Sequence, residues 1–349
     1  MTNSEPKVPE LRKPGAARRK PVSVSPAGLV TEGPLAPGAE LPLVIRPAVK
    51  GVDLAGWAAR QREFIEAKLL RHGGLLFRGF GVRTPEAFEG FIRAVSGEPL
   101  EYRERSSPRS QVSGNIYTST DHPASQSIFL HNENSYQHTW PLKVYFCCAV
   151  AAERQGETPI ADVRRVYARI SPETRERFRR RQWMYVRNFG DGLGLPWQTV
   201  FQTEDPAAVE EHCRRNGIRA EWKEGGRLRT RAVRPALARH PKTGEVVWFN
   251  HATFFHVTTL DPSVRDLLRE EFADDDLPTN TCYGDGSPIE DEVLEELRRA
   301  YREETVCFPW EEGDVMLLDN MLVAHGRSPY AGRRQILVGM AEPCGDRGL

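Results

Sequence analysis

The chain lacks several features that mark common classes of protein. It has no apolar stretch long enough to span a bilayer, so no transmembrane segment is expected. Its 48 basic and 48 acidic residues give a formal net charge of zero, which offers no argument for binding nucleic acid or a membrane surface. It also lacks the Gly-x-Gly-x-x-Gly motif of dinucleotide-binding folds and shows no internal repeat. These absences leave a globular protein that acts on small molecules or other proteins.

Cysteine usage points to a reducing compartment. The six cysteines stand at positions 147, 148, 213, 282, 307 and 344, and none forms a Cys-x-x-Cys pair. Cys147 and Cys148 are adjacent in an apolar, strand-like run, so their side chains should point to opposite faces. The basic, proline-rich N-terminus does not have the form of a secretory signal. We therefore predict buried free thiols and a cytoplasmic location.

Composition divides the chain into an arm and one large domain. Residues 1–40 are rich in Pro, Gly, Ala and Arg without an apolar period, which predicts a disordered or extended N-terminal arm. This arm carries a basic cluster, formed by Arg12, Lys13, Arg18, Arg19 and Lys20, which is either a solvated tail or a docking segment for an acidic partner. Residues 41–349 are expected to form a single domain.

Local patterns predict many short strands with helices between them. Asp53 should cap a helix reaching about Arg71, which Gly73 stops, and Thr84-Pro85 has the form of another helix start. Strands are expected at 75–80, 126–131, 142–151, 183–189, 218–222, 228–233, 245–250, 304–309, 314–319 and 335–340. Further helices are expected at 163–180, 205–216, 263–273 and 290–303. This mixture favours a mainly β, α+β fold with a sandwich core over a doubly wound sheet.

The most informative motif is His131-Asn132-Glu133. Residues i and i+2 of an extended segment share a face, so His131 and Glu133 can bind one ion. Two histidines and one carboxylate are the ligand set of non-haem Fe(II) sites, and His325 follows a turn and a buried apolar strand that could supply the third ligand. By itself, His-x-Glu could equally be two surface residues at a strand edge.

Further motifs accompany these three residues and carry a resemblance. Residues 156–162 read Gly-Glu-Thr-Pro-Ile-Ala-Asp, residues 319–320 and 325–327 read Asp-Asn and His-Gly-Arg, and residues 332–338 read Gly-Arg-Arg-Gln-Ile-Leu-Val. Together they resemble the taurine dioxygenase superfamily of Fe(II)/2-oxoglutarate oxygenases. Within it the chain is most similar to the clavaminate synthase-like and syringomycin-biosynthesis-type branch, because the carboxylate is Glu133 where many members carry Asp.

The resemblance implies a double-stranded β-helix, or jelly-roll, core with flanking helices. It implies that Fe(II) binds to His131, Glu133 and His325, with 2-oxoglutarate and O₂ as co-substrates. Arg334 is the expected anchor for the distal carboxylate of 2-oxoglutarate, because a guanidinium fork matches a carboxylate with two hydrogen bonds. Thr158 resembles the family threonine that hydrogen-bonds the same co-substrate.

The substrate is expected to resemble an amino acid, either free or tethered to a peptidyl carrier protein, and the reaction to be a hydroxylation. Desaturation, epoxidation or cyclisation would use the same residues, and a non-catalytic metal-binding sensor is the alternative of another class. No nucleic-acid or membrane partner is expected, and a homo-oligomer stays open. The polar candidates for substrate contacts are Arg105, Ser119, Arg187, Asn188, Asn250 and His251.

Overall fold

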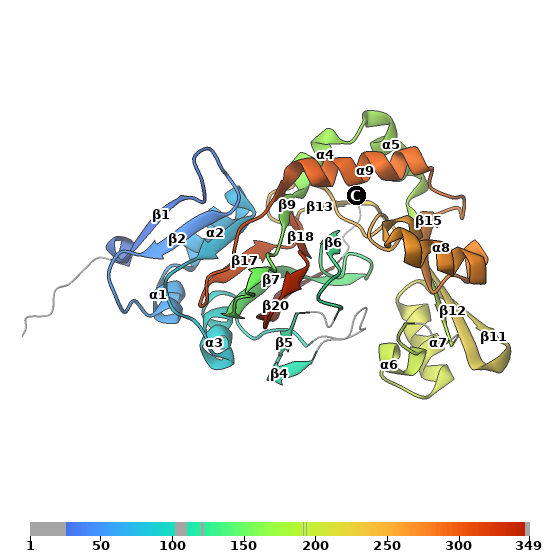
Figure 1. The fold of residues 1–349 in the computed structure, drawn as a ribbon, viewed down its shortest axis with the longest axis horizontal. Helices are drawn as coiled ribbons and strands as arrows, with labels where there is room; N and C mark the ends of the chain where they lie inside the picture. Colours follow the sequence, from blue (N-terminus) through green and yellow to red (C-terminus); the bar gives the residue numbers. More distant parts are fainter. Residues whose placement is uncertain (1–25, 102–109, 120–121, 191, 193, 346–349) are drawn as a thin grey trace, which may run out of the picture.

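The computed structural model describes residues 26–101, 110–119, 122–190, 192 and 194–345 of the 349-residue chain. Along its longest axis the molecule has three parts (Figure 1). An N-terminal layer of strands and helices lies at one end, two β-sheets occupy the centre, and a lobe built on another sheet forms the other end.

The large central sheet has eight strands in the order β1-β2-β3-β17-β7-β20-β5-β4. Its members are β1 (Val30–Pro34), β2 (Leu43–Pro47), β3 (Gly74–Phe77), β4 (Gln111–Ser113), β5 (Ile116–Thr118), β7 (Thr139–Val150), β17 (Val315–Asp319) and β20 (Gln335–Gly345). Pairing is antiparallel except between β2 and β3, which run parallel. Strand β7 is buried over most of its length, because both of its faces are covered.

A smaller sheet, in the order β16-β9-β18-β6, completes the jelly-roll core. Its strands are β6 (Ile128–His131), β9 (Ile160–Asp162), β16 (Thr305–Val306) and β18 (Val323–Arg327). Alternate residues of β7 enter different apolar cores. Phe146 and Cys148 face the core between the sheets, whereas Tyr145 and Cys147 face the core beneath the N-terminal helices. The expected opposite orientation of the adjacent cysteines is therefore observed.

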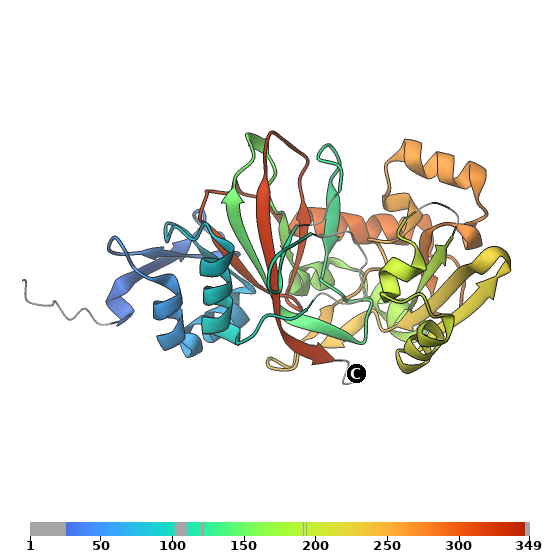
Figure 2. The ribbon, with the colours of Figure 1, turned by 90° about the horizontal axis from the view of Figure 1, so that it is seen from below.

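Helices cover both sides of the jelly roll (Figures 1 and 2). On the large sheet lie α1 (Leu54–Arg60), α2 (Arg62–His72) and α3 (Pro85–Ser96), and beside the small sheet lie α4 (Val163–Arg169), α5 (Pro172–Arg181) and α9 (Asp291–Glu304). Glu296 of α9 accepts hydrogen bonds from the backbone N–H of Ser171 and the hydroxyl of Thr174, so α9 holds the start of α5.

The lobe is inserted between β9 and β16. Its sheet has the order β11-β12-β10-β15, with β10 (Trp183–Phe189), β11 (Ile218–Lys223), β12 (Arg227–Arg234) and β15 (Thr279–Tyr283). Its helices are α6 (Trp197–Phe201), α7 (Pro206–Arg215) and α8 (Pro262–Glu271). Two two-stranded sheets complete the strand pairings. One is the hairpin of β13 (Leu237–Arg239) with β14 (Val246–Trp248), and the other pairs β8 (Arg154–Gln155) with the distant β19 (Tyr330–Ala331). Single-turn 3₁₀ helices lie at Pro26–Leu29, Glu224–Gly226, Val257–Thr259 and Asp274–Asp276.

The expected helix starts and stops are present. The carboxylate of Asp53 accepts from the backbone N–H of Gly56, and the Thr84 hydroxyl accepts from that of Ala87. Gly73 ends α2 in the left-handed conformation, with φ of +75°.

Several expected elements differ from the observed ones. The first helix is broken at Gln61 into α1 and α2, and the helix expected over 163–180 is broken before Pro172, whose ring cannot continue a helix from the preceding turn. The strand expected at 304–309 is limited to Thr305–Val306, because α9 continues to Glu304.

The segment expected to be an arm contributes one strand. Residues 30–34 form β1 and pair with β2, so this part is extended and joined to the large sheet. Residues 1–25, with the basic cluster, lie outside the described residues. The division into an arm and a single domain stays a prediction.

All six cysteines are free thiols. Burial raises the pKa of Cys147 and Cys148 to about 12. Cys307 is exposed, so the prediction of buried thiols is wrong for this residue, which lies in the connection after the short strand β16. None of the helices in the described ranges combines the length and apolar character needed to cross a bilayer.

Candidate active site

Two strands of the small sheet bring the predicted metal ligands together. His131 is the last residue of β6, and it lies directly opposite His325 of β18 in their antiparallel ladder. Glu133 follows in the turn after β6. Ligand atoms of the three residues lie within 4.8 Å of one another, and the Nε2 atom of His325 is 3.6 Å from Oε2 of Glu133.

The donor atoms fit a metal ion. The Nδ1 atom of His131 lies 2.9 Å from the carbonyl oxygen of Phe129, which assigns the ring hydrogen to Nδ1 and leaves Nε2 as the ligand atom. Nδ1 of His325 is buried without a hydrogen-bond partner among the described residues, and the 3.6 Å from Nε2 to Glu133 is too long for a normal hydrogen bond. Two imidazoles and one carboxylate that converge in this way have the character of a ligand set.

Asn320 holds the turn that carries Glu133. Its Oδ1 accepts from the backbone N–H of Glu133 at 2.7 Å, and its Nδ2 donates to the carbonyl oxygens of Glu133 and Pro141, each at 2.8 Å. Its own carbonyl oxygen accepts from Nδ2 of Asn132 at 2.7 Å. Asn320 is fully buried, so these bonds are shielded from water and fix the turn relative to β18.

Aromatic rings cover the two histidines. The Phe254 ring lies 4.5 Å from that of His131, and the Phe146 ring lies 4.9 Å from that of His325, measured between centroids. The His251 ring lies 5.5 Å from that of His131. Burial, and then the nearby His131, lowers the pKa of His251 well below its ordinary value. His251 is therefore a neutral imidazole, and its Nδ1 is hydrogen-bonded with Ser135 Oγ at 2.5 Å.

Arg334 has the properties expected of an anion anchor. Its Nε donates to the carbonyl oxygen of Gly156 at 2.8 Å and its Nη1 to Oγ of Ser119 at 3.2 Å. Both partners are neutral, and no described carboxylate forms a salt bridge with it. Burial, and then the neighbouring Arg327, lowers the pKa of Arg334 to about 10. A bound carboxylate would compensate this partly desolvated charge.

The glycine of the 156–162 motif is needed for this arrangement. Gly156 has φ of +80°, and a Cβ atom there would lie 2.8 Å from Cβ of Ala152 and 3.1 Å from Cδ of Arg334. A side chain at position 156 would therefore displace the guanidinium.

Thr158 is buried two residues later. Its Oγ1 accepts from the indole N–H of Trp310 at 3.1 Å, so the Thr158 hydroxyl keeps its own hydrogen to donate elsewhere.

The candidate substrate residues occupy several environments. Arg105 lies outside the described residues. Ser119 lies beside Arg334. Arg187 projects into a pocket of the lobe, and His251 lies beside His131.

Two of the candidates are engaged in backbone contacts. Asn188 donates to the carbonyl oxygens of Asp275 and Leu277 and accepts from Arg229. Asn250 donates to the carbonyl of Ala236 and accepts from the N–H of Ala252. These amides are occupied by their own chain, so their polar atoms are not directed at a small molecule.

Sequence reasoning did not identify several residues around the site. Asn320 lies in the motif that drew attention to His325, so its position was a usable signal for a role. Trp310, Phe146 and Phe254 gave no local signal, because their importance comes from contacts made across the fold.

We expect His131→Ala and His325→Ala each to abolish turnover and strongly weaken Fe(II) binding, because the two remaining ligands cannot fix the ion. Glu133→Gly should retain weak binding through both histidines but lose most activity. Anaerobic metal titration of the purified apoproteins measures the affinity, with His72→Ala as a control. A His131 or His325 variant with full affinity and activity would contradict the assignment.

Asn320→Asp should lower metal affinity roughly tenfold or more, the usual scale for groups that orient metal ligands. The new carboxylate oxygen would face the carbonyl oxygens of Glu133 and Pro141. Asn188→Asp is the matched control, because its amide also donates to two carbonyls, but in the lobe. Equal metal affinities in the two variants, with thermal unfolding measured alongside, would show that Asn320 does not position the ligands.

Comparisons with known proteins agree with this geometry. The family model described as "Taurine catabolism dioxygenase TauD, TfdA family" matches residues 33–341. The chain is 40% identical over 279 residues to the dapdiamide synthesis protein DdaC of Enterobacter agglomerans, covering 80% of this chain and 85% of that protein. It is 28% identical over 316 residues to a clavaminate synthase-like protein of Arabidopsis thaliana, covering 88% and 92%.

A solved structure shares the fold. PvcB of Pseudomonas aeruginosa, described as an Fe, alpha-ketoglutarate dependent oxygenase from an isonitrile synthetic pathway, superposes with a TM-score of 0.53 at 16% identity, covering 93% of this chain and 94% of PvcB. The family model matches most of the chain, and the donor set fits its metal. The chain therefore belongs to the taurine catabolism dioxygenase TauD, TfdA family and is an Fe(II)- and 2-oxoglutarate-dependent dioxygenase.

Proposed function

We propose that this dioxygenase hydroxylates an unactivated C–H bond of an amino acid or of a carrier-tethered aminoacyl group in natural-product biosynthesis. The observation that carries the proposal is the 40% identity to a protein of dapdiamide synthesis over most of both chains. The clavaminate synthase-like relative supports the same branch of the family. Glu133 at the carboxylate position weakens the case for a taurine-type substrate.

In this proposal His131, Glu133 and His325 hold Fe(II) on the inner face of the small sheet. Bound Fe(II) and 2-oxoglutarate supply the oxidising chemistry, in which O₂ converts 2-oxoglutarate to succinate and carbon dioxide as the substrate is oxidised. The protein fixes the ligands through the β6–β18 ladder and Asn320. The rings of Phe146 and Phe254 limit access of water to the two histidines.

Arg334 and Thr158 would bind the co-substrate. The guanidinium pairs with the distal carboxylate of 2-oxoglutarate, and Ser119 and the Gly156 carbonyl hold it in place. Thr158 donates its hydroxyl hydrogen to the same molecule, because Trp310 already occupies its acceptor side. A metal-binding sensor without catalysis would not need Arg334 and Thr158 to bind a co-substrate. Their presence therefore argues against the sensor alternative.

The carrier-protein alternative depends on a basic docking surface. In α5 the arginines that could form it are paired: Arg177 with Glu173 and Glu290, Arg179 and Arg180 with Glu176, and Arg181 with Asp285. This helix therefore presents little uncompensated positive charge to an acidic carrier, which weakens α5 as a docking site.

A screen for substrate-stimulated succinate production tests the proposal. We expect amino-acid derivatives, offered free and as carrier-bound thioesters, to stimulate 2-oxoglutarate turnover, with a product heavier by one oxygen atom. A product lighter by two hydrogens would identify desaturation or ring closure. Mass alone does not separate hydroxylation from epoxidation, so product NMR is required. Absence of stimulation by every amino-acid derivative would refute the proposed substrate class.

Arg334→Leu should raise the 2-oxoglutarate requirement about thirtyfold or more, because losing one partner of a buried charged pair costs about 2–5 kcal/mol. Metal affinity should be unchanged, since the three ligands remain. Arg333→Leu is the control, because Arg333 is exposed in the same segment. If Arg333→Leu alone impaired 2-oxoglutarate binding, the anchor would be assigned to the wrong neighbour.

A further inference from the structure

A row of polar side chains crosses the lobe sheet on one face. Arg187 of β10 lies opposite Thr230 of β12 on one side and Thr279 of β15 on the other. Residues paired in this way project to the same face of a sheet, so a guanidinium is flanked by two hydroxyls. Neither hydroxyl has a hydrogen-bond partner among the described residues.

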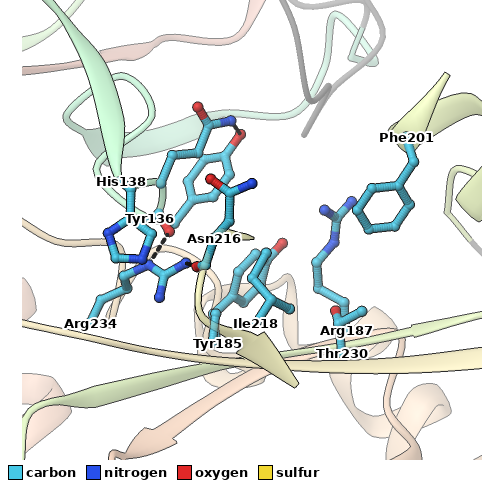
Figure 3. Close-up of a pocket in the computed structure, with 11 residues that line it drawn as sticks. Tyr136, His138, Tyr185, Arg187, Phe201, Asn216, Ile218, Thr230 and Arg234 are labelled. Atoms are coloured by element: carbon cyan, nitrogen blue, oxygen red, sulfur yellow. Dashed lines mark hydrogen bonds between the residues drawn. The ribbon is translucent and has the colours of Figure 1, made fainter. Parts of the chain in front are cut away.

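The Arg187 guanidinium has no acidic partner in the described part of the chain. Its contacts are with aromatic faces: its Cζ lies 4.7 Å from the centroid of the Phe189 ring and 5.6 Å from that of Tyr185. Figure 3 shows the side chain rising from the sheet beside the ring of Phe201, with Thr230 at its base. The charge is thus held in a fixed place by rings and is available to an anion.

Arginines on the opposite face of the same sheet behave differently. Arg231 pairs with Glu221 at 2.8 Å and lies 3.7 Å from Asp275, and Arg229 pairs with Asp276. Arg187 differs from these two arginines in having no ion pair among the described residues.

Aromatic contacts connect Arg187 to the iron site. Tyr185, the neighbour of Arg187 on the same face, stacks on Phe255 with ring centroids 4.3 Å apart. Phe255 stacks on His251 at 4.8 Å, and His251 lies 5.5 Å from His131. Tyr136 contacts both His251 and Tyr185, and it lines the same pocket as Arg187.

The pocket that Arg187 lines is small, with a volume of about 20 Å³, and it adjoins a larger open depression of about 640 Å³. The two share Gln137, His138, Phe201 and Asn216 as lining residues, and Arg187 lines the smaller pocket but not the depression.

We propose that Arg187, with Thr230 and Thr279, binds a free carboxylate of the substrate, while the aromatic wall positions the rest of that molecule toward the iron. This proposal rests on the proposed function and narrows the class of substrate. An aminoacyl group tethered to a carrier has its carboxyl group converted to a thioester, so a carboxylate subsite selects the free acid. The substrate class is therefore an untethered amino-acid derivative with an ionised carboxyl group.

The first test compares matched substrates in Arg187→Met, which removes the charge and retains length and packing. Amino acids and N-acylated amino acids are offered as carboxylates, as carboxamides and as carrier-bound thioesters. We expect KM for the carboxylate to rise about tenfold or more, the scale of a hydrogen bond to a charged group, with little change in kcat. KM for the carboxamide and for 2-oxoglutarate should not change.

Arg231→Met is the matched control, because it removes a paired guanidinium from the other face. Unchanged carboxylate KM in Arg187→Met, an equal loss for the carboxamide, or wild-type preference for the carrier-bound thioester would each overturn the proposal. Turnover of acids that are not amino-acid derivatives, with the same dependence on Arg187, would leave the carboxylate subsite standing and remove the proposed function.

The second test needs no substrate. Phenylglyoxal modifies accessible, unpaired guanidinium groups, and peptide mapping follows each arginine of the wild-type enzyme separately. Arg187 should be modified faster than Arg231, which is also partly buried but paired. Equal or slower modification of Arg187 would overturn the claim that its charge is available, even if no compound in the substrate panel is turned over.

Discussion

The ladder between β6 and β18 is the contact on which the iron centre depends. It sets His131 opposite His325, although the two residues are far apart in the chain. A histidine pair in register does not place the carboxylate, because Glu133 lies beyond the end of β6. The side-chain amide of Asn320, in the segment before β18, holds Glu133 in position through hydrogen bonds to the backbone of Glu133. The short stretch from Asn320 to His325 thus supplies one proposed ligand and orients another.

Many arginines of this molecule are paired with acids, whereas Arg334 and Arg187 are not paired with a described acid. Most arginines of α5, and Arg229 and Arg231 of β12, are paired with acids, and the net charge of the chain is zero. Arg334 and Arg187 are among the partly buried arginines that form no ion pair with a described residue. An unpaired, partly buried guanidinium costs folding free energy, which an anionic ligand can recover on binding. The lowered pKa of Arg334, about 10, is the electrostatic sign of that cost.

The sequence predicted the starts and ends of helices well, because these depend on contacts between neighbouring residues. Asp53, Gly73 and Thr84 act through neighbouring backbone groups, so their roles follow from residue type and position. The motifs predicted that His131, Glu133 and His325 would lie together, because family resemblance contains long-range contacts that spacing alone does not.

Failures occurred where a side chain is engaged by distant backbone. Asn188 and Asn250 have the polarity of substrate-binding residues, and only the folded chain reveals that carbonyl groups of Leu277 and Ala236 occupy them. Trp310 was missed because its hydrogen-bond partner, the side chain of Thr158, lies in another part of the chain. Arg187 and Asn188 are adjacent in β10, so their side chains project to opposite faces of the sheet. Arg187 therefore lines a pocket, whereas Asn188 hydrogen-bonds to the protein's own backbone.

The lobe is inserted in the chain between β9 and β16, so the histidine-bearing strands and the Arg187 row lie in different sheets. The strands that bear the ligand histidines belong to the jelly roll, whereas the Arg187 row belongs to a sheet with its own apolar cluster around Phe189, Val200 and Leu228. The same sheet also contributes Trp183, Tyr185 and Tyr283 to the core that contains residues of β9 and β18. Substitutions near Phe189 and Val200 should therefore change the far end of the lobe alone, whereas substitutions at Trp183 or Tyr185 should also disturb the strands that carry the two histidines.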